Sequence, residues 1–202
     1  MRIGIFGGTF DPVHLGHLIL AEQCRDQAGL DEVRFVPTAV PPHKARPDLT
    51  RFEQRCDMLD LATAGHPHFR VDRIEKDLPP PSYTAATLAE LHRREPGHEF
   101  FLLLGSDCLP DLPGWYQPRR VVEQAGLVVM PRPGVPLWTA DRLAAALGLD
   151  ESQVRMQLVT TPLIEIASRE LRRAVADGRS VRYLVPRAVE EYIRERKLYA
   201  VK

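Results

Sequence analysis

The sequence predicts an α/β protein in which a parallel sheet carries helices on both faces. Two observations support this prediction. Short apolar runs alternate with helical segments along the whole chain, and the runs at 2–6 and 100–104 end in glycines. Parallel sheets of this kind bind ligands beyond the carboxyl ends of their strands. The 202 residues contain no repeat, low-complexity tract or linker, so we expect a single domain over 1–202.

Six short segments are the predicted strands. They lie at residues 2–6, 33–36, 69–74, 100–104, 127–130 and 154–159. The run at 100–104 is apolar at every position, which is typical of a central strand that is buried on both faces. The run at 154–159 is the last of the series and is predicted to be an edge or final strand.

Seven segments are predicted to be helices, at 15–29, 50–65, 83–94, 121–124, 143–147, 168–176 and 187–196. The second begins at Thr50-Arg-Phe-Glu53, a capping-box pattern in which each side chain bonds the other residue's backbone N–H, and it ends at Gly65. Its expected apolar face consists of Phe52, Cys56, Leu59 and Ala62. The last two helices would form a C-terminal helical part over about 160–202.

The composition excludes several classes of protein. Twenty-seven Lys and Arg balance 27 Asp and Glu, which argues against a protein that coats a polyanion but leaves room for a local basic pocket. No apolar run reaches the ~18 residues of a membrane span, and the N-terminus does not resemble a secretory signal. Cys24, Cys56 and Cys108 lack CxxC spacing, which is typical of a reducing cytoplasm without disulfides or structural zinc.

The segment Gly7-Gly-Thr-Phe-Asp-Pro-Val-His-Leu-Gly-His17 joins the first predicted strand to the first predicted helix. Two glycines allow a ligand to approach the backbone closely, and the positive N-terminal end of the helix favours an anion. His14 and His17 are three residues apart on the first helical turn, so their imidazoles can share one face. Together these features predict a phosphate site beside two imidazoles.

Other interpretations of this segment are weaker. It contains neither GxGxxG nor GxxxxGK[ST], so the fingerprints of a dehydrogenase and of a P-loop are missing. A plain turn followed by two surface histidines would explain the histidine pair alone, but not its combination with the glycines, the strand and the helix. A zinc site lacks a third ligand at a recognisable spacing.

The same segment resembles the signature of the HxGH nucleotidyltransferase superfamily, and further matches resemble bacterial nicotinate-nucleotide adenylyltransferases. These are Pro41-Pro-His-Lys44, Ser82-Tyr-Thr-Ala-Ala-Thr-Leu88, Gly105-Ser-Asp107, Trp115-Tyr116, Leu184-Val-Pro186 and Tyr192-Ile193. They occur in order over nearly the whole chain. The resemblance implies a Rossmann-like fold and direct in-line transfer of the adenylyl group from ATP to nicotinate mononucleotide. The products would be deamido-NAD and pyrophosphate, in the cytoplasm, with Mg²⁺ bound mainly through ATP and water.

The resemblance also implies a set of site residues. The catalytic residues would be His14, His17, Lys44 and Arg172, and those that bind ATP would be Gly7, Gly8, Thr9, Phe10, Gly105, Asp107 and Ser168. The residues that bind nicotinate mononucleotide would be Thr84, Trp115, Tyr116 and Arg132. Trp115 would stack on the pyridine ring, and Arg132 would hold the phosphate. From residue type alone, Trp115 could instead be a hydrophobic plug and Asp107 an N-cap for the turn near Leu109.

Two segments depart from the family pattern. Where relatives carry Ile-Ser-Ser-Thr-x-x-Arg, this chain has Ile166-Ala-Ser-Arg-Glu-Leu-Arg172, in which Arg169 could either add charge or face solvent. Thr38-Ala39 replaces polar amide residues of many relatives.

The rival functions are transfer to another acceptor, such as nicotinamide mononucleotide or phosphopantetheine, and a nucleotide sensor without turnover. No nucleic-acid partner is expected, because no aromatic-interleaved basic cluster is present. No membrane partner is expected, because no apolar run is long enough to span a bilayer. The oligomeric state is left open.

Overall fold

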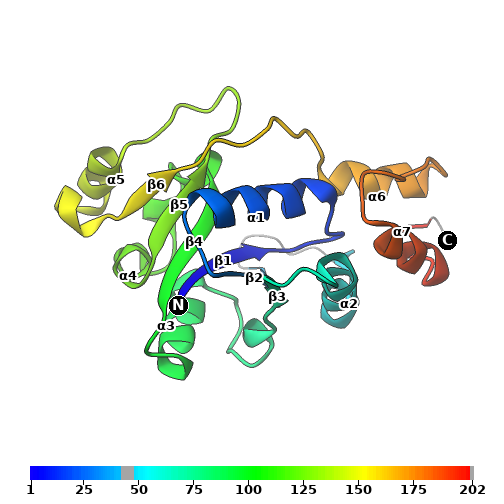
Figure 1. Ribbon diagram of the computed structural model, residues 1–202, viewed down its shortest axis with the longest axis horizontal. Coiled ribbons are helices and arrows are strands. Elements are labelled where there is room, and N and C mark those ends of the chain that lie inside the picture. The colour runs from blue at the N-terminus through cyan, green and yellow to red at the C-terminus, as the bar shows by residue number, and fades with distance from the viewer. Residues whose placement is uncertain (42–47, 201–202) are drawn as a thin grey trace.

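The computed structural model describes residues 1–41 and 48–200, which form a doubly wound parallel sheet (Figure 1). The strands are β1 (Arg2–Gly8), β2 (Glu32–Pro37), β3 (Phe69–Val71), β4 (Glu99–Gly105), β5 (Gly126–Met130) and β6 (Met156–Leu158). All are parallel, in the order β3-β2-β1-β4-β5-β6. The chain reverses its direction of travel across the sheet between β1 and β4, which is where such sheets bind ligands. The predicted Rossmann-like fold is confirmed.

The helices are divided between the two faces of the sheet. They are α1 (Leu15–Gln27), α2 (Phe52–Thr63), α3 (Thr84–Arg94), α4 (Pro118–Gln124), α5 (Ala140–Leu147), α6 (Ser168–Ala176) and α7 (Arg187–Glu195). Residues of α1, α2, α6 and α7 belong to one buried cluster, and residues of α3, α4 and α5 belong to a second. In Figure 1, α6 and α7 lie together beyond the ends of α1 and α2.

The central strand β4 supplies side chains to both clusters. Phe101 and Leu103 pack with the cluster of α1 and α2, whereas Phe100, Leu102 and Leu104 pack with the cluster of α3 and α4. Successive side chains of a strand point to opposite faces, so an uninterrupted apolar run is what a strand covered on both faces requires. This is why the run at 100–104 predicted a central strand correctly.

Several predicted boundaries are wrong by a few residues, and the capping box is wrong altogether. The N-cap of α2 is Arg51, and no side chain caps this helix. The side chain of Thr50 instead bonds to Tyr199, and the carbonyl of Thr50 accepts a hydrogen bond from Nε of the buried Arg55. Strand β3 ends at Val71, and β6 spans only Met156–Leu158 at the sheet edge.

The C-terminal helices share a core with the sheet. The buried apolar residues of α6, of α7 and of the segment between them belong to the same cluster as those of α1 and α2; they are Leu171, Ala174, Val181, Val185, Val189 and Ile193. The division of the chain into one domain with a C-terminal helical part stays a prediction. None of the described helices combines the length and the apolar character that a bilayer span needs.

The packing of α3 on the sheet gives a first prediction. Leu88 has no exposed surface, so Leu88→Ala should lower the free energy of unfolding by about 2–5 kcal/mol, because it leaves a cavity between helix and sheet. Leu163, which is 66% exposed, provides the control, and its replacement by alanine should change stability by less than about 0.5 kcal/mol. Urea unfolding measures both. Equal losses in the two variants would contradict this packing.

Candidate active site

A cavity of about 590 Å³ opens at the carboxyl ends of β1 and β4. The predicted site residues on its wall are Gly7, Gly8, Thr9, Phe10, His14, His17, Thr84, Gly105, Asp107, Trp115, Tyr116, Arg132 and Ser168. The structure therefore brings together segments that are far apart in the sequence. Arg172 does not line the cavity, and Lys44 lies outside the described residues.

The two histidines form a stacked pair on the cavity wall. His14 is the N-cap of α1, and its ring lies 3.6 Å from the ring of His17, measured between centroids at an angle of 22°. The backbone N–H of His14 donates to Nδ1 of His17, so the neutral ring of His17 carries its proton on Nε2. Phe6 and Phe10 contact the His17 ring with near-perpendicular rings. The sharing of one face predicted from the i, i+3 spacing is confirmed.

Both imidazoles are held in the neutral form. Burial, reinforced by the positive charge of Arg132, lowers the pKa of His14 to about 4. Burial also lowers the pKa of His17 well below its usual range, and His14 and Arg132 add to this effect. Neutral rings donate hydrogen bonds without adding charge, and an anion placed beside them would favour protonation. A Cβ on Gly16 would lie 3.0 Å from Nδ1 of His14, so a side chain at position 16 would crowd this pair.

The loop between β1 and α1 is fixed from behind by three side chains. The carbonyl of Thr9 accepts from Nη1 of Arg55 at 2.7 Å, and that of Asp11 accepts from Nη1 of Arg172 at 2.6 Å. The carbonyl of Pro12 accepts from Oγ of Ser168 at 2.9 Å. Arg172 thus binds the loop and not the cavity. The loop also holds Phe10 at a φ of +47°, a left-handed conformation that bulky residues adopt only when their surroundings impose it.

Arg55 is a site residue that sequence reasoning missed. Its guanidinium is buried and donates to the carbonyls of Thr50, Thr9 and Thr38, so one side chain ties together the segments that follow β1 and β2. Burial lowers the pKa of Arg55, and the charge of Asp11 opposes this effect. Its position between apolar residues on α2 was the available signal, because an arginine on a buried helical face must have partners.

Aromatic residues form the opposite side of the cavity. Trp115 lines the cavity and also packs against the core under α3 and α4, so it is both a partial plug and exposed to a ligand. The ring of Tyr83 stacks on Tyr116, with centroids 4.4 Å apart. Thr84 is the first residue of α3, and it lies directly after Tyr83. The sequence reasoning identified Trp115, Tyr116 and Thr84 but not the role of Tyr83.

A buried carboxyl group, also missed from the sequence, joins two loops of this aromatic side. Glu75 accepts from the backbone N–H of Ala39 at 3.2 Å and from the hydroxyl of Thr87 at 3.0 Å. Ser82 bonds to Glu75 as well, and its Oγ accepts from the N–H of Val40. Burial raises the pKa of Glu75, and these donors oppose the rise. Nothing in the local pattern around Glu75 indicated burial.

A half-exposed ion pair stands where β4 and β5 end. Nε of Arg132 lies 3.4 Å from Oδ1 of Asp107, and the backbone N–H of Arg132 donates to Oγ of Ser106 at 2.8 Å. Gly105 leaves the space for this pair, because a Cβ there would lie 2.2 Å from the Asp107 oxygen. Asp107 lies inside the short turn Ser106–Cys108 and forms no N-cap, so that alternative is wrong.

The segment that departs from the family pattern still reaches the cavity. Ile166, Ala167 and Ser168 line it at the start of α6. Arg169 is 83% exposed at its side chain and bonds to Glu170, so it faces solvent rather than adding charge to the cavity.

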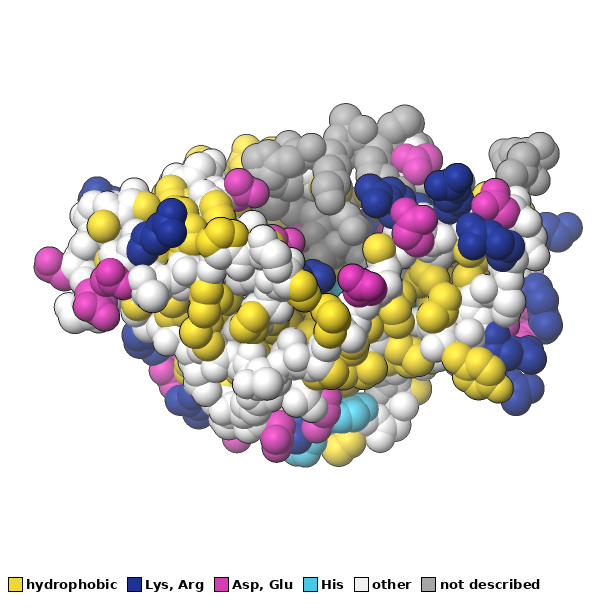
Figure 2. Space-filling view, turned by 90° about the horizontal axis from the view of Figure 1, so that it is seen from above, with side chains coloured by type: hydrophobic (Ala, Val, Ile, Leu, Met, Phe, Trp, Pro, Cys, Tyr) yellow, Lys and Arg dark blue, Asp and Glu magenta, His cyan; other side chains and the backbone are white. Residues whose placement is uncertain are grey.

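The C-terminal segment is basic as a whole, because residues 168–202 contain ten Lys and Arg against five Asp and Glu. Figure 2 shows Lys and Arg side chains gathered, with Asp and Glu among them, at the end of the molecule where α6 and α7 lie in Figure 1.

Comparisons with known proteins agree with this geometry. The model of the cytidylyltransferase-like family matches residues 5–174. A probable nicotinate-nucleotide adenylyltransferase of Thermus thermophilus is 44% identical over 98% of this chain and 100% of its own length. That of Thermomicrobium roseum is 43% identical over 98% and 91%. Nicotinic acid mononucleotide adenylyltransferase of Plasmodium falciparum complexed with NaAD superposes with a TM-score of 0.78 over 98% of this chain and 97% of that chain, and at 19% identity this likeness concerns the fold.

The depressed pKa of His14 gives a prediction about stability. The unfolded chain takes up a proton near pH 6.5 whereas folded His14 does so near pH 4, so this contribution to stability is complete above pH 6.5 and is lost as the pH falls toward 4. His14→Gln removes it. Between pH 7 and pH 5 the unmodified protein should lose about 2 kcal/mol more stability than His14→Gln. Urea unfolding at both pH values measures this, with His68→Gln as the control. Parallel pH dependence of all three proteins would contradict the buried neutral state.

Proposed function

The chain belongs to the cytidylyltransferase-like family and is a relative, over its full length, of bacterial nicotinate-nucleotide adenylyltransferases, and we propose on this basis that it transfers the adenylyl group of ATP to nicotinate mononucleotide. The products would be deamido-NAD and pyrophosphate. The observation that carries the proposal is a single cavity with a buried histidine pair and a braced loop on one side and a set of aromatic rings on the other. Such a cavity suits two substrates, of which one brings a triphosphate and the other a flat ring.

The histidine side of the cavity suits the triphosphate. Nε2–H of His17 is free to donate because Nδ1 is already an acceptor, and His14 lies directly against this ring. The N-terminal ends of α1 and α6 both meet the cavity, and helix N-termini favour anions. Gly7, Gly8, Thr9 and Phe10 would supply backbone to the phosphates. Arg172 would act by holding this loop, and a role for Lys44 stays a prediction.

The aromatic side suits the acceptor. Trp115 presents an indole on which an electron-poor pyridine ring can stack. Backbone N–H groups near Thr84 and Tyr116 would bind the nicotinate carboxylate, which accepts hydrogen bonds only, in preference to the amide of nicotinamide. Arg132 would hold the phosphate of the mononucleotide, and its ion pair with Asp107 keeps it at the mouth of the cavity.

The reaction needs positioning more than it needs a nucleophilic side chain. An oxygen of the acceptor phosphate would attack the α-phosphorus of ATP in line, and the bond from that phosphorus to the bridging oxygen of pyrophosphate would break. The two imidazoles and the helix N-termini would stabilise the negative charge that develops on the α-phosphate. No covalent intermediate on the protein is required.

The site suits a Mg²⁺ ion that is bound mainly by ATP. In the described ranges 1–41 and 48–200, no group of three or more His, Cys, Asp or Glu side chains could hold a metal ion by itself. Asp107 offers one half-exposed carboxylate on the wall, an oxygen donor of the kind that Mg²⁺ prefers. Binding mainly through the phosphates and water, with Asp107 as the protein's contact, would neutralise part of the triphosphate charge. The cytoplasmic location stays a prediction.

Turnover tests the proposal directly. The protein with ATP, Mg²⁺ and nicotinate mononucleotide should release pyrophosphate, and His17→Ala should abolish most of the release whereas His68→Ala should not. Equal or faster turnover with nicotinamide mononucleotide would reassign the acceptor and keep the reaction class. Release with neither acceptor would favour a nucleotide sensor over an enzyme.

The acceptor side has its own test. Trp115→Ala should raise the KM for nicotinate mononucleotide by about tenfold, because the ring loses its stacking surface, and leave the KM for ATP within about twofold. Trp138, which lies under Arg142 and away from the cavity, is the matched control. Steady-state kinetics with each substrate varied measures both variants. An unchanged acceptor KM would return Trp115 to a purely structural role.

A further inference from the structure

A hydrogen bond joins the C-terminal end of the described chain to the loop that carries the histidines. The hydroxyl of Tyr199 donates to Oδ1 of Asp11 at 2.7 Å, across 188 residues of sequence. Asp11 has no exposed surface, so its carboxylate is bonded entirely within the protein. Burial and the charge of Asp11 raise the pKa of Tyr199, which keeps its hydroxyl protonated as a donor.

Tyr199 and the residue that precedes Asp11 both have a strained, left-handed backbone conformation. Phe10, which precedes Asp11, has a φ of +47°, and Tyr199 has a φ of +64°. Bulky residues avoid the left-handed region unless the surrounding structure imposes it, and such outliers gather at functional sites. Neither residue stands in a solvent-exposed turn where a glycine would serve, because Phe10 is buried and Tyr199 packs against the cluster of α6 and α7.

The bond is one of several between the C-terminal segment and this loop. Nη1 of Arg172 binds the carbonyl of Asp11, and the same atom lies 3.9 Å from Oδ2 of its carboxylate. Oγ of Ser168 binds the carbonyl of Pro12, and the carbonyl of Leu184 accepts the N–H of Leu15. The main-chain contacts fix the path of the loop, whereas the hydroxyl of Tyr199 bonds to the buried carboxylate and the guanidinium of Arg172 lies close to it.

We propose that Tyr199 is a positioning residue that acts through Asp11 to hold the histidine pair and the neighbouring loop in the geometry that receives the triphosphate. This inference rests on the proposed function for its substrate, but the contact itself does not. Asp11 adjoins Phe10 on the cavity wall and precedes His14 by three residues. Loss of this hydrogen bond should therefore let the loop that carries the histidines shift on the ATP side of the cavity. Trp115 and Tyr116, on the far side, should keep their positions.

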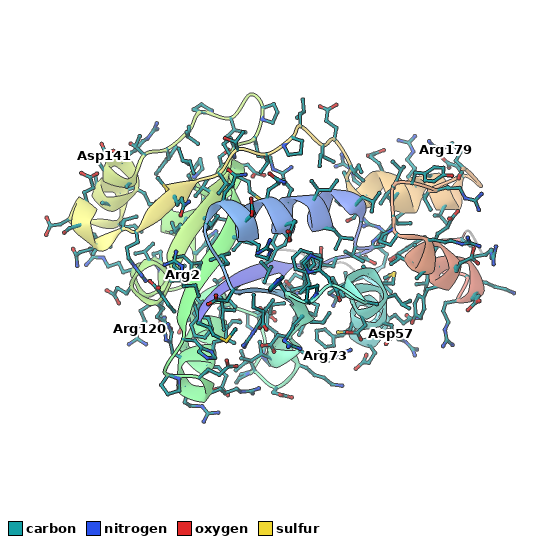
Figure 3. All side chains as sticks on the ribbon, in the orientation of Figure 1. Arg2, Asp57, Arg73, Arg120, Asp141 and Arg179 are labelled. Carbon is teal, nitrogen blue, oxygen red and sulfur yellow. The ribbon has the colours of Figure 1, made fainter. Side chains whose placement is uncertain are left out.

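Tyr199→Phe tests the proposal, and the chain supplies a matched control. The hydroxyl of Tyr192 donates to Oδ2 of Asp57 at 2.6 Å, which is also a tyrosine-to-carboxylate bond made by the C-terminal segment. Asp57 lies on α2, where Figure 3 labels it, and neither partner lines the cavity. Tyr192→Phe thus removes the same chemistry at a place that does not touch the loop.

Binding separates the two variants. Tyr199→Phe should weaken binding of adenosine α,β-methylene triphosphate about tenfold, the scale of a hydrogen bond to a charged group, and should lower kcat. Binding of nicotinate mononucleotide should stay within about twofold. Tyr192→Phe should leave the two affinities and kcat within about twofold, and it should lower the melting temperature less than Tyr199→Phe does, because its hydrogen bond is exposed whereas Asp11 is fully buried. Equal nucleotide affinity in Tyr199→Phe and Tyr192→Phe, or equal loss for both ligands in Tyr199→Phe, overturns the proposal.

The ring nitrogens of the histidines provide a readout that does not depend on turnover. In the unmodified protein, nitrogen-15 shifts should report His17 with its proton on Nε2. Tyr199→Phe should move these shifts toward an average of the two tautomers, and Tyr192→Phe should not. Unchanged His14 and His17 shifts in Tyr199→Phe overturn the positioning role. Absence of pyrophosphate release by the unmodified protein, with the expected shifts present, contradicts the proposed function and upholds the role of Tyr199.

Discussion

The rest of the site depends on how the carbonyl groups of the loop between β1 and α1 are satisfied. A ligand that binds at this loop through backbone N–H groups needs those groups directed toward it, and the carbonyls must then find donors elsewhere. Arg55 from α2 takes the carbonyl of Thr9, while Arg172 and Ser168 from α6 take those of Asp11 and Pro12. These donors hold the loop on the side that faces away from the cavity. The loop is therefore rigid, and its histidines and glycines stay directed toward the cavity.

The same arrangement explains how a protein of zero net charge can serve phosphorylated substrates. The two imidazoles are neutral because burial opposes their protonation, and the permanent charges of Arg55 and Arg172 are used behind the loop and not in the cavity. Among the described lining residues, Arg132 is the one Lys or Arg, and it is half-exposed and paired with Asp107. Positive side-chain charge is therefore kept at the mouth of the cavity, and the histidine side of the interior presents dipoles and N–H donors, which cost less to bury than an unpaired charge.

Sequence patterns predicted the architecture because they report which face of an element is buried. The uninterrupted run of β4 and the alternation of strands with helices require a parallel sheet covered on both sides, and this was correct. The pattern of α2 was interpreted less well. The apolar positions were found, but the buried Arg55 among them, which binds the carbonyls of Thr9 and Thr38, was not recognised. The capping box that Thr50 and Glu53 indicated is absent, and the side chain of Thr50 bonds to Tyr199 instead. A local motif fails when a long-range contact takes one of the polar groups that it needs.

By itself the sequence determined the fold class, the ligand-binding edge of the sheet and the histidine pair, because strand periodicity and the i, i+3 spacing are properties of local backbone geometry. The family resemblance also identified Trp115, Tyr116 and Arg132, which line the cavity. Only the tertiary structure decided that Arg172 braces the loop, that Arg169 faces solvent, that Glu75 joins two loops and that Tyr199 reaches Asp11. Apart from the exposure of Arg169, those are pairings that span from tens of residues to nearly the whole chain, and no periodicity in a sequence records which distant donor meets which buried acceptor.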